Sequence, residues 1–79
     1  FSAPYLRGGL YALLRAEDAG RYRSASDVIN AQANVGVVVG TTGDTFLQKK
    51  MRNAARWGVS KPSAAPFELG NHRIDLFIH

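Results

Sequence analysis

The chain has 79 residues with a net charge of +4, 46% hydrophobic residues and no cysteine. This composition is typical of one small folded domain and excludes a disordered chain, a disulfide framework and a thiolate metal site. The longest apolar runs are far shorter than the roughly 20 residues that a membrane-spanning helix needs, and the positive charge would suit an anionic partner such as nucleic acid, anionic lipid or a carboxylate ligand.

The first predicted element covers residues 5–15, an apolar and aromatic stretch with Gly8 and Gly9 at its centre. We predict a strand interrupted by a bulge at the glycine pair. A leucine-rich helix is the alternative, but central glycines weaken a helix and the preceding Pro4 favours an extended entry. Residues 17–23 are polar and contain a glycine, which indicates an exposed loop.

A short helix and a buried strand are expected next. Ser24 precedes Asp27 by three residues, which is the capping pattern of a helix start, and the helix should end near Ala33. Residues 35–39 are almost wholly apolar and β-branched. This pattern is typical of a strand buried on both faces of a parallel sheet, so helices should cover the sheet.

The same capping spacing recurs at Thr41 and Asp44 and predicts a second helix. Four basic residues are expected toward the end of this helix, namely Lys49, Lys50, Arg52 and Arg56. An acid in the first turn and bases in the last turns complement the helix dipole, so we interpret the cluster as a solvated helix face. Nucleic-acid binding is therefore not expected, despite the net charge.

The remaining elements alternate in type. Residues 57–60 indicate a short edge strand, because a proline follows closely. Residues 63–69 indicate a short helix with a left-handed exit at Gly70 and Asn71, and residues 74–78 another buried strand. The alternation predicts an α/β fold with a mainly parallel sheet and flanking helices.

The turn after the strand at residues 35–39 is the best candidate for a ligand site. Ligands of parallel sheets bind where the strands end, and this turn reads Gly-Thr-Thr-Gly at residues 40–43. Glycines allow close backbone approach, and the N–H groups of a new helix attract a carboxylate or phosphate. The structural alternative stays open, because any tight turn favours glycine and any helix start favours threonine. The spacing matches neither a Walker A motif nor a dinucleotide fingerprint.

We expect no catalytic set, metal site or cofactor. His72 and His79 are seven residues apart without a neighbouring cysteine, a spacing that fits no compact metal site. The serines lack a nucleophile elbow, and no paired carboxylates fall on an expected cleft edge.

Three segments, in order, carry a family resemblance: residues 1–5 (Phe-Ser-Ala-Pro-Tyr), 35–47 and 73–78. Together they resemble the polar-amino-acid solute-binding proteins of ATP-binding-cassette (ABC) importers, extracellular solute-binding family 3. The resemblance implies one lobe of a type II periplasmic-binding-protein-like fold, in a periplasmic or extracytoplasmic protein. Residues 1–79 would be a single partial domain, the second lobe, with the first lobe, the C-terminal return and any export signal outside it.

The resemblance also implies residue roles. Thr42 and the backbone N–H of Gly43 would hold the α-carboxylate of the ligand, the backbone around Val38 would approach the ligand, and Thr41 would support the turn. The acid that binds the α-ammonium group in this family follows the strand that corresponds to residues 74–78. The connection over residues 57–69 looks shortened, and Gly43 replaces a larger polar residue of many relatives, so the ligand stays unassigned.

The implied function is binding of an amino acid or similar small carboxylate by lobe closure, and delivery to the membrane permease of an ABC transporter. The alternatives are a periplasmic-binding-protein-like module of an enzyme, such as a dehydratase or lytic transglycosylase, or of a sensor receptor. An isolated lobe would leave an unpaired sheet edge and apolar surface exposed. We therefore expect the fragment to self-associate.

Overall fold

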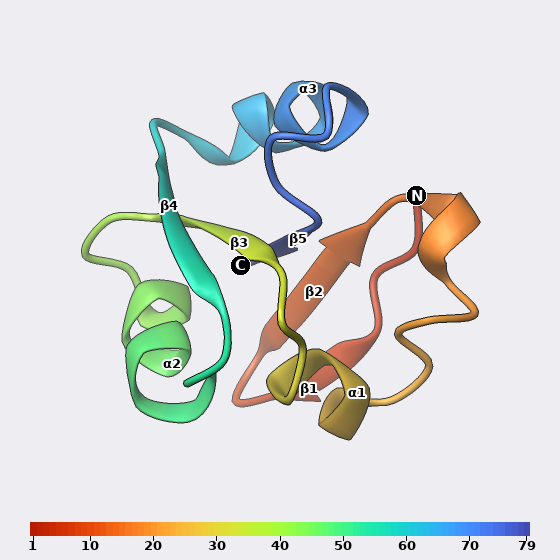
Figure 1. Cartoon of the computed structure of the whole chain (residues 1–79). Coiled ribbons are helices and arrows are strands. Elements are labelled where there is room, and N and C mark those ends of the chain that lie inside the picture. Colours follow the sequence, from red (N-terminus) through yellow and green to blue (C-terminus); the bar gives the residue numbers. More distant parts are fainter.

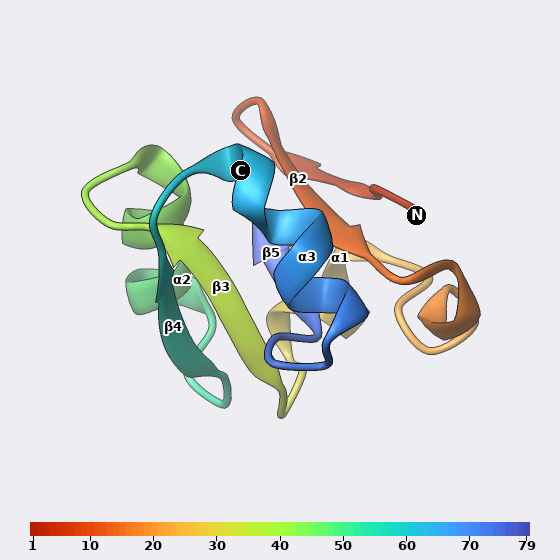
Figure 2. The same cartoon turned by 90° about the horizontal axis from the view of Figure 1, so that it is seen from above.

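The computed structural model describes residues 1–79 as one five-stranded sheet of order β1-β2-β5-β3-β4, covered by short helices. The strands are β1 (Tyr5–Arg7), β2 (Leu10–Leu14), β3 (Asn34–Val38), β4 (Ala55–Val59) and β5 (Leu76–Ile78). The helices are α1 (Ala25–Ile29), α2 (Thr42–Lys50) and α3 (Ala65–Gly70). Helices α1 and α2 cover one face of the sheet and α3 covers the other (Figures 1 and 2).

The predicted α/β architecture is confirmed, but its sheet is mixed. Strand β3 pairs parallel with β4 and β5, whereas β1 with β2 and β2 with β5 pair antiparallel. The expectation of a mainly parallel sheet was wrong because the first segment enters the sheet as an antiparallel hairpin.

This hairpin also replaces the predicted bulged strand over residues 5–15. Gly8 and Gly9 have φ of +60° and +82° and reverse the chain between β1 and β2. Positive φ at both central residues is the requirement of a type I′ turn, which glycine meets without strain. The pair therefore marks a turn between two strands, and it brings the ring centroids of Tyr5 and Tyr11 to 5.2 Å.

The core divides into two clusters, one on each face. The larger cluster lies under α1 and α2 and includes Val28, Val35, Val37, Phe46, Leu47, Leu76 and Ile78. The smaller cluster lies under α3 and consists of Val59, Ala65, Leu69, Ile74 and Phe77. Side chains of a strand alternate between faces, so the consecutive Phe77 and Ile78 of β5 belong to different clusters.

The helix starts predicted at Ser24 and Thr41 are confirmed, whereas the helix predicted over residues 63–69 is α3, Ala65–Gly70. The Ser24 hydroxyl accepts from the backbone N–H of Asp27 at 3.2 Å, but α1 ends at Ile29 rather than near Ala33. The predicted buried strand is β3, except that Val39 lies beyond it and is 65% exposed.

The second half of the chain differs from the prediction in two places. The basic cluster is not one helix face, because α2 ends at Lys50 and Arg56 belongs to β4. Strand β4 is the predicted edge strand, and it starts two residues earlier than expected, at Ala55. The left-handed residue after α3 is His72, with φ of +59°, instead of Gly70 or Asn71. No helix of the chain is long and apolar enough to cross a bilayer.

Candidate functional site

The candidate site lies where α2 begins, at the edge of the sheet where β3 and β5 end. Parallel strands end at the same edge, so the turn after β3 adjoins the end of β5. Strand β2 runs the opposite way, and its first residues reach this edge too. Tyr11 and His79 exchange two backbone hydrogen bonds there, at 2.9 and 3.0 Å.

The turn into α2 depends on the backbone conformation of Gly40 and on the Thr41 hydroxyl, which donates one hydrogen bond and accepts another. Gly40 has φ of +83°, which glycine adopts without strain. The Thr41 hydroxyl donates to the carbonyl oxygen of Val38 at 2.7 Å and accepts from the N–H of Asp44 at 3.4 Å. The Thr41 N–H also donates to Val38 O, at 3.2 Å. Thr41 is thus the N-cap of α2, and the Val38 carbonyl is engaged within the turn.

The buried carboxylate of Asp44 stabilises the turn at residues 40–43. Asp44 is only 3% exposed, and its Oδ2 accepts from the N–H of Gly40 at 2.9 Å. Arg56 of β4 donates to both carboxylate oxygens, from Nε at 2.6 Å and from Nη2 at 2.7 Å, and Gln48 donates to Oδ1 at 2.9 Å. The hydrogen bonds from Arg56, then those from Gln48 and Gly40, hold the pKa of Asp44 well below its usual range. The bond to Asp44 in turn raises the pKa of Arg56.

Two donors of the helix start are left without a partner. Among the backbone hydrogen bonds of the chain none is donated by the N–H of Thr42 or of Gly43, whereas the N–H groups of Asp44 and Thr45 are bonded to Thr41. Unpaired N–H groups and the helix dipole together favour an anion at a helix N-terminus. The Asp44 carboxylate is already engaged, so this start can accept a second negative group.

Gly43 is a point of close approach between α2 and the end of β5. It is buried, and a Cβ placed on it would lie 2.6 Å from the carbonyl oxygen of Ile78, the last residue of β5. A real Cβ does not approach a backbone oxygen so closely, so the glycine has a packing reason. Thr42 beside it is exposed.

The four predicted site residues therefore lie in one turn with different surroundings. Thr42 and Gly43 carry the unpartnered N–H groups, Thr41 caps the helix, and the Val38 side chain packs on the α3 face. Sequence reasoning missed the bond from Arg56 to Asp44, because it placed Arg56 on the helix. The alternation along β4 could have indicated it, since Arg56 falls on the α2 face of the sheet and Val59 on the α3 face.

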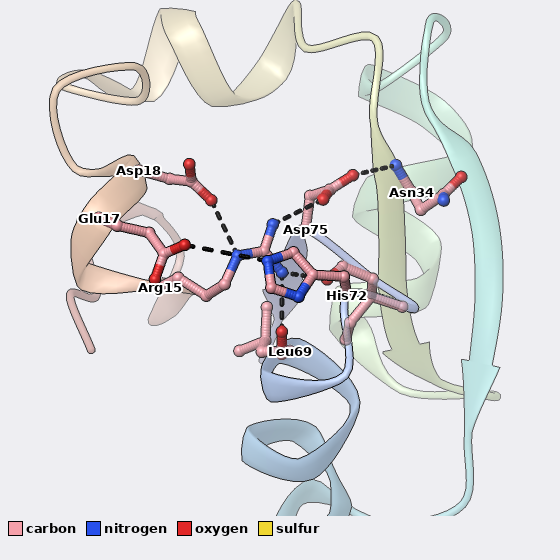
Figure 3. Close-up of polar contacts among 8 residues, drawn as sticks. Arg15, Glu17, Asp18, Asn34, Leu69, His72 and Asp75 are labelled. Atoms are coloured by element: carbon pink, nitrogen blue, oxygen red, sulfur yellow. Dashed lines mark hydrogen bonds and ion pairs between the residues drawn. The ribbon is translucent and has the colours of Figure 1, made fainter.

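The opposite edge of the sheet contains a second network that the sequence did not indicate, centred on Arg15 (Figure 3). Arg15 is 7% exposed and donates to Asp75 at 2.7 Å, to Asp18 at 3.0 Å, and to the carbonyl oxygens of Leu69 and Ile74 at 2.8 and 2.9 Å. Burial lowers the pKa of Arg15, but its bonds to Asp75 and Asp18 outweigh this and raise it.

The Arg15 network connects several elements at the edge where β3 and β5 begin. The other Asp75 oxygen accepts from the N–H of Asn34, the first residue of β3, at 3.2 Å. Beside it, His72 and Glu17 approach to 3.9 Å, but both are exposed, and such pairs contribute little. We interpret the network as structural. No group of three or more His, Cys, Asp or Glu side chains could hold a metal ion.

No protein-family model and no curated protein matches the sequence. Solved structures match the fold. One is an ancestral amino-acid-binding protein described as a precursor of cyclohexadienyl dehydratase, with a TM-score of 0.79 and 21% identity. The match covers 90% of this chain and 32% of that protein. The chain has the fold of one lobe of the amino-acid solute-binding proteins.

Two further structures support this fold. An ancestral cyclohexadienyl dehydratase matches the lobe with a TM-score of 0.79 and 28% identity, over 100% of this chain and 33% of its own. An amino-acid ABC transporter substrate-binding protein from Streptococcus pneumoniae, bound to L-arginine, matches with a TM-score of 0.75 and 20% identity. The match covers 95% of this chain and 30% of that protein. The lobe spans about a third of the length of these structures.

Proposed function

We propose that this lobe holds the carboxylate of an amino acid, or of a similar small ligand, as part of an extracytoplasmic binding protein. That protein would close two lobes around the ligand and deliver it to the permease of an ABC importer. In this proposal residues 1–79 are the second lobe.

The observation that carries the proposal is the pair of unpartnered N–H groups on Thr42 and Gly43. They lie at the edge of the sheet where ligands of such folds bind. We assign the carboxylate to these two N–H groups and the Thr42 hydroxyl, with the Thr41 cap holding the turn. The backbone after Val38 lies beside the bound ligand.

The bonds behind the turn explain why this site would be ready before the ligand arrives. Thr41 holds the Val38 carbonyl, and Asp44 holds the Gly40 N–H, so the turn does not have to be ordered on binding. Such preorganisation removes part of the entropy cost of binding. Asp44 is itself engaged by Arg56, so the ligand's ammonium group needs a different acceptor.

The proposal is tested by following backbone amide resonances of the chain during titration with L-arginine and with a panel of other amino acids. Addition of carboxylate ligands should shift the Thr42 and Gly43 amide resonances further than those of other residues. The matched amino-acid amides, which lack the carboxylate, should leave both in place. Equal shifts with acid and amide, or ligand-induced shifts confined to other residues, would contradict the proposal.

A second candidate is supported by the 28% identity to an ancestral cyclohexadienyl dehydratase over the whole chain. In this case the same N–H pair would hold the carboxylate of a cyclohexadienyl acid while other groups remove water. Incubation of the protein with such an acid distinguishes the two. Formation of a product lighter by one water, alone or together with carbon dioxide, supports the dehydratase when followed by mass spectrometry, and binding without turnover supports the transport protein.

A further inference from the structure

The tip of the β1–β2 hairpin lies beside α2 (Figure 1). Residues of both elements line a groove outside the proposed carboxylate site. Its volume is about 240 Å³. The residues that form it are Arg7, Gly8 and Leu10 of the hairpin and Thr42, Thr45, Phe46, Lys49 and Lys50 of α2. Only Thr42 also belongs to the carboxylate site.

The hairpin forms one wall of the groove and α2 the other, and the surface that lines the groove is almost wholly apolar. Leu10 and Phe46 are each 8% exposed and belong to the core cluster under α2, so only a small part of each reaches the surface. The wall residues Arg7, Thr45 and Lys49 are exposed. A protruding apolar side chain would find apolar contacts in this groove.

The charges around the groove are all positive and all free. Arg7 lies on the hairpin wall, and Lys49 and Lys50 lie on the helix wall. No acidic residue lines the groove, and none of the three cations forms an ion pair within the chain. Arg15 and Arg56 differ in this respect, because both are committed to aspartates.

We propose that this groove docks an acidic segment of a partner protein, with one apolar side chain in the hollow and carboxylates of Asp or Glu on either side of it. An apolar anchor in a pocket within a ring of polar contacts is the usual arrangement of an interface hot spot. Complementary charge then speeds association and orients the segment.

The charge of the groove favours this occupant over two others. Nucleic acid would use exposed aromatic rings for stacking, and Phe46 is buried. A small monocarboxylate offers one negative group, whereas the cations stand on two opposite walls. The inference does not rest on the proposed amino-acid site, since seven of the eight lining residues lie outside it.

The test measures binding of a fluorescent nonapeptide, Gly-Ser-Glu-Glu-Leu-Glu-Glu-Ser-Gly, to the full chain by anisotropy. Binding should weaken about fivefold to tenfold when the central leucine becomes serine or the glutamates become glutamine, and it should weaken with added salt. The double variant Lys49→Gln/Lys50→Gln should lose a similar factor. The matched pair Arg52→Gln/Lys61→Gln removes the same charge outside the groove and should change little.

A second variant tests the hollow without changing charge. Thr45→Trp fills the groove from an exposed position of α2 and should abolish peptide binding, whereas Asn53→Trp, at an exposed turn, should not. Circular dichroism confirms that each variant is folded. Equal losses in both charge pairs, unchanged binding in Thr45→Trp, or tighter binding to anionic lipid vesicles than to the peptide would overturn the proposal.

Discussion

The α-carbon of Gly43 faces the carbonyl oxygen of Ile78 so closely that a Cβ on Gly43 would lie 2.6 Å from it. This contact sets how near the start of α2 comes to the end of β5. It also gives the helix start its position relative to both strand ends. The unpartnered N–H groups of the proposed site depend on that position.

Gly43→Ala should therefore destabilise the lobe by about 1–3 kcal/mol, because the backbone oxygen cannot move aside and α2 must shift. Thermal unfolding measures the change. The matched control is Gly70→Ala, where no atom lies within 4 Å of the added Cβ and φ is not positive. A Gly43→Ala protein as stable as the Gly70→Ala protein would contradict the close approach.

The bond between Arg56 and Asp44 predicts a dependence of stability on pH. The pKa of Asp44 is lower in the folded chain than in the unfolded chain, so its stabilisation is fully present above about pH 4, the ordinary range of the group. It is lost as pH falls below that value, when the folded carboxylate becomes protonated.

Asp44→Asn should thus lower the unfolding temperature at pH 7 by several degrees and should make stability less dependent on pH below 4. The control is Glu17→Gln, whose side chain is 70% exposed. Urea unfolding between pH 2 and pH 7 measures both effects. The stabilising role of the bond between Arg56 and Asp44 is wrong if the native protein and Asp44→Asn lose stability in parallel over this range.

Arg15 should be the cation whose loss costs the lobe most stability. Arg15→Met leaves Asp75 and two carbonyl oxygens without their donor in a largely buried site, a change that costs about 3 kcal/mol in comparable cases. Arg21→Met, at an exposed position, should cost much less. Chemical denaturation of the two variants gives the comparison, and similar midpoints would argue against a structural network.

Capping spacing and β-branched runs predicted the helix starts and the central strands, because these signals are local. The Thr41 hydroxyl accepts from the N–H of Asp44, only three residues away. The apolar composition of residues 35–39 itself indicates a buried strand. The turn of the proposed site was found by the same local signals. Its surroundings were not, because they come from distant segments.

Non-local relationships explain each failure. Gly8 and Gly9 fit both a bulge and a turn, and only the pairing of β1 with β2 decides between them. Arg56 follows Asp44 by twelve residues and reaches it from a neighbouring strand. The closeness of Gly43 to Ile78 joins elements 35 residues apart, by the difference of their numbers. The periodicity of apolar residues in the sequence does not indicate such contacts between distant segments.

The most direct test of the proposed carboxylate site compares two variants of Thr42. Proline is tolerated at the first position of a helix, and the extended backbone of Thr41 suits a following proline. Thr42→Pro therefore removes the N–H and the hydroxyl while keeping the helix start, and Thr42→Ala removes only the hydroxyl.

Affinity for an amino acid that binds the protein is then measured by calorimetry for both variants, after circular dichroism confirms their fold. Loss of a donor to a charged group predicts roughly tenfold or greater weakening in Thr42→Pro relative to Thr42→Ala. Equal affinities in the two folded variants would contradict the claim that the start of α2 holds the carboxylate of the ligand.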